Sequence, residues 1–259
     1  LIRAHTRLMV DAGRRVTILA GRGATFNRSA TFRRLPLLDS KHPAILAVGD
    51  ELAQGVVSAG FHRAEQAIRE QLRAHLADVD VCIVHNAFSL HKNLPLTAAL
   101  WRMASDGDGP PMVAYCHDLA WVSPQYLPAL HEGAPWDLLR KPAPGVRYVT
   151  VSRDRLRQFG ELWRAEQPDV LVAPNAVDAA ALLRLSPAGQ RLALEFDLWE
   201  QDLTLLLPAR LTRRKNVEFA IRVAASLAAR GVALRLVVTG PPGPHNVANA
   251  GYVRELDDL

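Results

Sequence analysis

Two cationic side chains, Arg210 and Lys215, stand in a short loop between an apolar run and a helical pattern. Residues 206–216 have the pattern of a strand, a basic loop and a helix that Asn216 would cap. Such a crossing brings both cations to a helix N-terminus, where free N–H groups and the helix dipole already attract an anion. A guanidinium can grip two phosphate oxygens at once, and an ammonium adds a compact charge. The loop therefore predicts a diphosphate site, with a solvated basic turn as the alternative.

Polar residues also follow three apolar runs in the first half of the chain. They are His85 and Asn86 after residues 79–84, His117 and Asp118 after residues 112–116, and Ser152 after residues 147–151. In open α/β sheets ligands bind where strands end, because loops and helix N-termini converge there. We therefore expect an active-site role for His117, with His85 and Asn86 as further contacts. Asp118 is expected either to orient His117 or to cap the strand end, and Ser152 to cap the next helix.

The elements that must position these groups are short β-rich runs alternating with longer segments of helical period. This alternation is typical of the α/β class with parallel sheets. Residues 61–76 repeat apolar side chains at helical spacing and predict a long amphipathic helix. Residues 24–58 carry few periodic signals and are expected to form an irregular excursion with short elements. After a domain boundary near residue 177, strands at 203–207 and 232–239 predict that a second Rossmann-like unit begins.

Composition narrows the function classes. The 259 residues carry a formal net charge of +5, but the basic residues are spread out, without an aromatic-interleaved stripe, which argues against nucleic acid. The apolar runs are too short to span a bilayer, so we expect a cytoplasmic protein, with peripheral membrane contact left open. Cys82 and Cys116 lie within apolar runs and are predicted to be reduced core thiols.

Four short motifs occur in the order in which glycosyltransferase family 4 carries them. They are His117-Asp118 after a strand, the strand end Val149-Thr150-Val151-Ser152, the turn Pro174-Asn175-Ala176-Val177-Asp178, and the step Arg210-Leu211-Thr212-Arg213-Arg214-Lys215-Asn216. The turn departs from the family's pattern at Ala176, where glycine is usual. Each motif is weak alone, but their order and spacing make the chain resemble this family over roughly half its length.

The resemblance implies transfer of a hexose from a nucleoside diphosphate sugar to a small hydroxyl acceptor, with retained anomeric configuration and without a metal or other cofactor. It implies that Arg210 and Lys215 stabilise the departing diphosphate. It also implies that His117 faces the transferred sugar across a cleft. Asn175 is expected either to contact the donor or to fix the interdomain turn. Gly240 is expected on the donor side, because a glycine lets the backbone approach a phosphate or sugar.

On the acceptor side we expect His85, Asn86 and Lys92, and Lys92 could hold an acidic acceptor. Ordinary loop polarity explains Lys92 equally well. Three segments are similar to a subgroup that includes mannosylglucosylglycerate synthases. They are Leu90-His91-Lys92-Asn93-Leu94-Pro95, Cys116-His117-Asp118-Leu119-Ala120-Trp121 and Thr239-Gly240-Pro241-Pro242-Gly243-Pro244-His245-Asn246.

The family has the GT-B fold of two Rossmann-type domains, so residues 1–176 are expected to form the acceptor-side domain and residues 177–259 the start of the donor-binding domain. The first would lack its initial strand and the second would be incomplete. The family's glycine-rich loop would precede Leu1 and its pair of glutamates would follow Leu259, which predicts that this chain alone is inactive or very weak. The alternatives are a non-catalytic nucleotide-sugar or phosphate-binding module and a GT-B-shaped epimerase.

Overall fold

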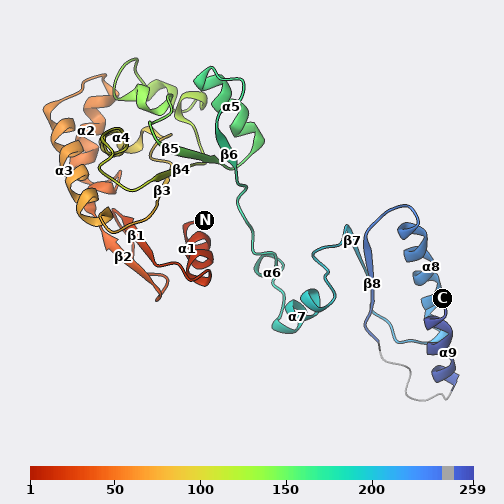
Figure 1. Cartoon of the computed structure of the whole chain (residues 1–259). Coiled ribbons are helices and arrows are strands. Elements are labelled where there is room, and N and C mark those ends of the chain that lie inside the picture. The colour runs from red at the N-terminus through yellow and green to blue at the C-terminus, as the bar shows by residue number, and fades with distance from the viewer. Residues whose placement is uncertain (241–247) are drawn as a thin grey trace. The chain divides into compact units, whose positions relative to one another are not determined.

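The chain has an α/β fold built from parallel strands. The computed structural model describes residues 1–240 and 248–259 (Figure 1). These residues form two compact units, unit 1 at Leu1–Ala176 and unit 2 at Val177–Leu259. Every strand pair in the described residues is parallel, and helices connect most of the paired strands. The predicted α/β class with parallel sheets is therefore confirmed.

Unit 1 contains two hydrogen-bonded sheets. The smaller pairs β1 (Val16–Ala20) with β2 (Ala30–Arg34). The larger has the order β3-β4-β5-β6, with β3 (Cys82–His85), β4 (Met112–Cys116), β5 (Val146–Thr150) and β6 (Val170–Val172). Because these four strands are parallel, the segments that follow them all leave from the same edge of the sheet.

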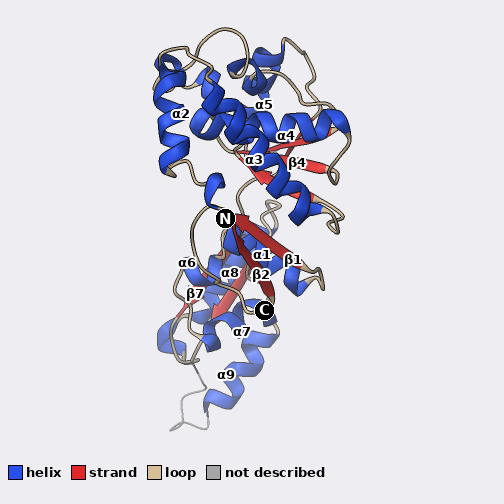
Figure 2. Cartoon of the chain, turned by 90° about the vertical axis from the view of Figure 1, so that its left-hand side faces the viewer, coloured by secondary structure: helices blue, strands red, loops and turns tan. Residues whose placement is uncertain are grey.

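Five α-helices accompany these sheets: α1 (Ile2–Asp11), α2 (Pro43–Ala53), α3 (Ala59–Leu76), α4 (Leu94–Asp106) and α5 (Arg153–Trp163). Helices α3 and α4 lie side by side (Figure 2). Ile68 of α3 and Leu100 and Met103 of α4 are at most 2% exposed and belong to the main core cluster. This burial explains why α3 has the predicted apolar face at helical spacing.

Side-chain caps fix where the helices of unit 1 begin. The Ser58 hydroxyl accepts hydrogen bonds from backbone N–H groups in the first turn of α3, and Asn93 does the same for α4. Ser152 Oγ accepts from Arg155 N at 3.2 Å and caps α5. Each cap satisfies donors that a helix N-terminus otherwise leaves without partners. The predicted cap at Ser152 is confirmed.

Two local expectations for unit 1 were wrong. Residues 24–58 are more regular than the expected short elements, because they contain both β2 and the eleven-residue helix α2. Helix α2 starts with Pro43, which suits a first helical turn, and then buries Ile45 and Val48 on one face. Strand β3 begins three residues later than predicted, since Val79 N donates back to Leu76 O in the turn that ends α3.

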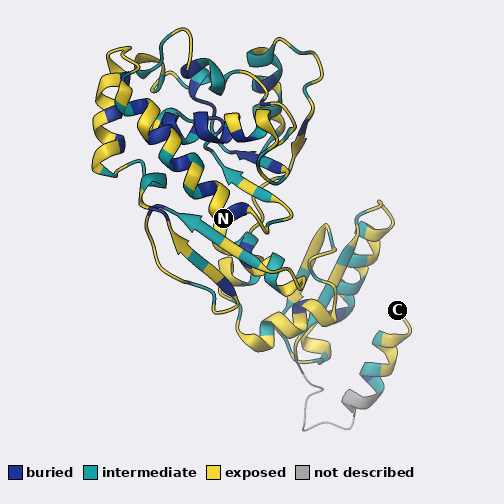
Figure 3. Cartoon of the chain, turned by 60° about the vertical axis from the view of Figure 1, so that its left-hand side comes forward, coloured by how far each residue is buried: buried dark blue, intermediate teal, exposed yellow. Residues whose placement is uncertain are grey.

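Unit 2 is built around one parallel strand pair. Strand β7 (Leu203–Leu207) pairs with β8 (Leu234–Val238), and α8 (Val217–Ala228) connects them. The other helices are α6 (Ala179–Leu182), α7 (Pro187–Glu195), the 3-10 turn η6 (Arg213–Lys215) and α9 (Ala248–Asp257). Buried residues are dense in unit 1 and sparse in unit 2 (Figure 3). Among the described residues, no helix is long and apolar enough to cross a membrane.

Leu100→Ala is expected to lower the free energy of unfolding of unit 1 by about 2–5 kcal/mol, because Leu100 is fully packed in the core and leaves a cavity. Leu46→Ala on α2 is the matched control, since Leu46 is 49% exposed and the same truncation removes little buried contact. Urea denaturation followed by tryptophan fluorescence measures both. Equal losses for the two variants would contradict this assignment of the core.

Candidate functional site

The ends of β3 and β4 bring two of the predicted histidines together. His85 is paired in register with Tyr115, and His117 follows Tyr115 by two residues. Side chains two residues apart on a strand point to the same face. The ring centroids of His85 and Tyr115 lie 5.4 Å apart, those of Tyr115 and His117 5.1 Å, and those of the two histidines 6.0 Å. The three histidines His5, His85 and His117, together with the Tyr115 ring that they surround, are called the imidazole cluster below; His5 is described next.

His5 on α1 is the member that sequence reasoning missed. Its ring centroid lies 5.6 Å from that of His85 and 5.1 Å from that of Tyr115. Tyr115 was also missed, although it lies in β4 only two residues before His117, just after that strand. Nothing in the local pattern of α1 distinguishes His5, because its neighbours in the cluster are more than 75 residues away along the chain. Only the packing of α1 reveals it.

Backbone and side-chain contacts hold His117 in place. Asn86 adopts a left-handed conformation, with φ of 61°, and its Oδ1 accepts a hydrogen bond from His117 N at 2.8 Å. Asn86 N in turn donates to Tyr115 O at 3.0 Å. Asp118 pairs with Arg155 of α5 at 3.1 Å. Thus the predicted acceptor residue Asn86 holds the His117 backbone through its side-chain oxygen.

The imidazole cluster favours neutral rings. Burial, and then the nearby His5 and His117, together lower the pKa of His85 from its ordinary 6.5 to about 4. The pKa values of His5 and His117 are also lowered, first by burial, although Asp118 opposes the shift at His117. A neutral imidazole has one nitrogen that donates and one that accepts a hydrogen bond. Such rings can therefore bind hydroxyl groups.

Lys92 belongs to a second group of side chains in unit 1, in the 3-10 turn η2 (His91–Asn93). Its Nζ lies 4.5 Å from the Tyr126 ring centroid and 3.4 Å from His91 Nε2. The pKa of His91 is lowered to about 4, mainly by burial and then by the charge of Lys92. The Lys92 ammonium is exposed and faces no carboxylate among the described residues, so it is a cation available to an anionic group.

In unit 2, the basic segment at residues 210–215 contains both a cation held in an ion pair and cations that are available to a ligand. Arg213 is tied to α9, where Nη2 lies 2.5 Å from Glu255 Oε2 and the guanidinium lies 5.0 Å from the Tyr252 ring centroid. Arg210 and Lys215 are exposed and have no ion-pair partner within residues 1–240 and 248–259. The two cations predicted to bind a diphosphate are therefore available, whereas Arg213 serves to anchor the loop.

The expected helix cap at Asn216 was wrong. Asn216 occupies the N-cap position of α8, but its φ is 47° and its side chain makes no capping hydrogen bond. The left-handed backbone instead closes the turn after η6, where Asn216 N donates to Arg213 O at 3.0 Å. In the first turn of α8 the acidic residue is Glu218, whose carboxylate accepts a hydrogen bond from the Tyr252 hydroxyl at 2.6 Å.

The remaining donor-side predictions divide between the two units. Asn175 is exposed near the end of unit 1 and has no side-chain hydrogen bond in the described residues. Gly240 follows β8 and lies against the backbone of Ala209 and Arg210. The rest of the predicted loop after Gly240, residues 241–246, lies outside the described residues. The roles assigned to Asn175 and Gly240 stay predictions.

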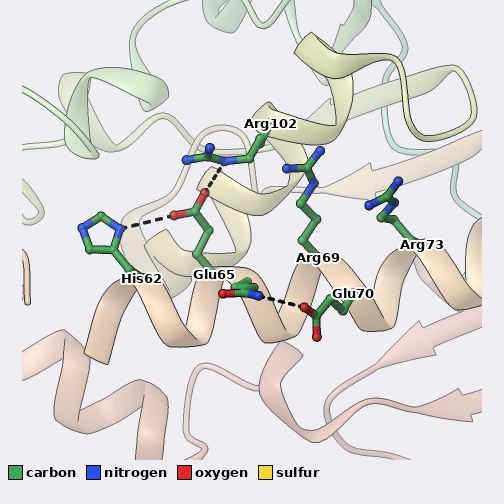
Figure 4. A pocket seen from close by; sticks show the side chains of 7 residues that line it. His62, Glu65, Arg69, Glu70, Arg73 and Arg102 are labelled. Atoms are coloured by element: carbon green, nitrogen blue, oxygen red, sulfur yellow. Dashed lines mark hydrogen bonds and ion pairs between the residues drawn. The ribbon is translucent and has the colours of Figure 1, made fainter. Parts of the chain in front are cut away.

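A hollow of about 380 Å³ opens between α3 and α4 (Figure 4). Its arginines already face carboxylates. Arg102 Nε lies 2.8 Å from Glu65 Oε1, and Arg69 pairs with both Asp106 and Asp108. An incoming anion would have to displace these ion pairs. The pairs therefore join the two helices, and the hollow is not an open anion site. The described residues contain no group of three or more His, Cys, Asp or Glu arranged to hold a metal ion.

The imidazole cluster makes unit 1 sensitive to acid. The pKa of His85 is depressed in the folded protein, so between about pH 6.5 and pH 4 the unfolded chain binds a proton that the folded chain excludes. The contribution of His85 to the free energy of unfolding is therefore full above pH 6.5 and is lost as the pH falls through this window. His85→Phe, which keeps a ring but cannot titrate, is expected to flatten the fall in melting temperature. His75→Phe, at an exposed position on α3, is the control and should leave the pH dependence unchanged.

Comparison with known proteins points to sugar transfer. The chain is 28% identical over 153 residues to a mannosylglucosylglycerate synthase of Petrotoga mobilis, which covers 59% of this chain and 35% of that protein. It is 26% identical over 170 residues to the synthase of the same name from Thermotoga maritima, covering 63% of this chain and 37% of that one. The matches thus span little more than a third of these curated relatives. No protein-family model matches the chain. The similarities support a glycosyltransferase relationship.

Proposed function

We propose that this chain is part of a retaining glycosyltransferase of the GT-B type that moves a hexose from a nucleoside diphosphate sugar to a hydroxyl acceptor. In this proposal unit 2 binds the donor and unit 1 binds the acceptor. The observation that carries it is the pair of available cations, Arg210 and Lys215, in the segment between β7 and α8. The resemblance to the synthases adds sugar transfer as the reaction that such a site would serve.

The proposed reaction requires that the negative charge on the leaving diphosphate be stabilised. When the bond between the anomeric carbon and the diphosphate oxygen breaks, the diphosphate leaves with the electron pair. Arg210 can hold two of its oxygens, and Lys215 adds a point charge near the helix N-terminus, so the leaving group is stabilised as it forms. As the acceptor oxygen bonds to the anomeric carbon, its hydroxyl proton passes to the departing diphosphate oxygen.

Unit 1 would supply neutral contacts to hydroxyl groups. His117, held by Asn86 through its backbone N–H, is the proposed catalytic residue of this unit and contacts the transferred sugar. His85 and His5 extend the same cluster and are proposed to bind hydroxyls of the acceptor. Because burial keeps these rings uncharged, each can donate one hydrogen bond and accept another, which suits a polyol.

The acceptor is proposed to carry a carboxylate. The relatives' name describes a product that contains glycerate, which is an acid. Lys92 offers an exposed ammonium whose Nζ rests over Tyr126 and faces no described carboxylate. An ammonium held in this way can pair with a carboxylate at the cost of little further ordering.

Arg210→Ala and Lys215→Ala are each expected to raise the dissociation constant for a nucleoside diphosphate roughly tenfold to a hundredfold, because each removes a charged hydrogen-bond partner worth about 1.5–3 kcal/mol. Isothermal titration of the chain with UDP, GDP and ADP in turn measures this. Arg230→Ala, which changes an exposed arginine just past the C-terminal end of α8, is the matched control and should bind as the unmodified chain does.

Sugar transfer itself is assayed on the protein as its gene encodes it, with product identified by mass spectrometry. Diphosphate binding without any transfer would favour a non-catalytic binding module. Conversion of the nucleotide sugar without an acceptor would favour an epimerase. Diphosphate affinity unchanged in both Arg210→Ala and Lys215→Ala would refute the donor site.

Lys92→Ala is expected to raise the KM for an acceptor with a carboxylate about tenfold and to leave the KM for its neutral methyl ester unchanged, since only the acid loses an ionic partner. Initial rates in the transfer assay measure both constants. Lys41→Ala, an exposed lysine elsewhere in unit 1, is the control. An equal rise in KM for the acid and the ester would show that Lys92 does not bind the carboxylate.

A further inference from the structure

The carboxyl end of β8 presses against the loop that carries Arg210. An ideal Cβ on Gly240 would lie 2.1 Å from Ala209 O and 2.3 Å from Arg210 Cα. Real Cβ atoms do not approach other heavy atoms so closely, and the atoms in the way are backbone rather than the end of a flexible side chain. Only a residue without a side chain fits between the two strand ends.

The contact lies just beyond the last paired residues of the sheet. Leu207 is in register with Val238, and Leu207 O accepts hydrogen bonds from Thr239 N at 3.3 Å and from Ala209 N at 2.9 Å. One carbonyl thus joins both segments at the point where they leave the sheet. From there the chain runs through Arg210 with its backbone against Gly240.

The other end of the loop is also anchored. Arg213 is joined to Glu255 of α9 and lies over the Tyr252 ring, and Tyr252 is 1% exposed. A side chain at position 240 would therefore push against the backbone of Arg210, three residues before Arg213 and its ion pair with Glu255. The strain would fall on the short segment between them, and the guanidinium of Arg210 would move relative to Lys215.

We propose that Gly240 is a positioning residue for Arg210, which acts through backbone contact and sets where the guanidinium meets the diphosphate. The role in diphosphate binding rests on the proposed function, whereas the positioning of the Arg210 backbone does not. This role differs from direct approach of the Gly240 backbone to the donor. In the proposed role, Gly240 contributes to diphosphate affinity only through Arg210.

The experiment compares Gly240→Ala with Gly251→Ala in the whole chain. Gly251 lies on α9, and a Cβ there would meet no atom within 4 Å. Gly240→Ala is expected to accelerate amide hydrogen exchange of residues 208–212 and to raise the dissociation constants for UDP, GDP and ADP at least tenfold. Gly251→Ala is expected to change neither. Circular dichroism checks that both variants keep their helices.

A double-variant cycle separates positioning from general loosening. In an Arg210→Ala background, Gly240→Ala is expected to cause no further loss of diphosphate affinity, because the residue through which it acts is gone. A further loss as large as that in the unmodified background would overturn the proposal. So would unchanged exchange of residues 208–212 in Gly240→Ala.

A measurement on the unmodified chain keeps the test independent of whether Gly240→Ala folds. A nuclear Overhauser contact between the Hα protons of Gly240 and Arg210 is expected, and its absence would overturn the positioning. If the protein as its gene encodes it binds none of UDP, GDP and ADP, the proposed donor site fails. The Overhauser contact and the exchange of residues 208–212 then still decide whether Gly240 positions the Arg210 backbone.

Discussion

The structure depends on parallel strands that end at a common edge and deliver polar groups from distant parts of the chain to one place. In unit 1 the register of β3 against β4 sets His85 beside Tyr115, and the two-residue alternation adds His117 to the same face. A shift of one residue in this register would turn these side chains to opposite faces. In unit 2 the pairing of β7 with β8 likewise brings Gly240 to the backbone of Arg210.

The two units prepare opposite electrostatic environments. In unit 1, burial lowers the pKa values of the clustered histidines and favours neutral rings, which suits hydroxyl groups better than charged ones. In unit 2, Arg210 and Lys215 stay exposed and charged, whereas Arg213 is held by Glu255. A neutral polyol and an anionic diphosphate are the two ligand types that these environments match. That correspondence links the physical chemistry to the proposed sugar transfer.

Much of the fold could be predicted because the relevant signals are local. The apolar spacing of α3, the strand β4 and the serine cap of α5 are properties of a few consecutive residues, and each lies where the sequence predicts it. Helix α2 was missed because its apolar face is short and lies between segments without periodicity. The cap at Asn216 was mistaken because residue type does not reveal a left-handed backbone.

By itself, the sequence determined the α/β class and placed His85, His117, Arg210 and Lys215 next to predicted strand or helix ends, because those patterns are written in neighbouring residues. Only the tertiary structure decided that His5 lies against the other histidines of the imidazole cluster, and that Gly240 packs against the backbone of the loop that carries Arg210. It likewise decided that Arg213 is paired with Glu255 while Arg210 has no ion-pair partner in the part of the chain that the structure describes. The reason is that burial, pairing and contact belong to residues far apart in the chain, and only folding brings them together.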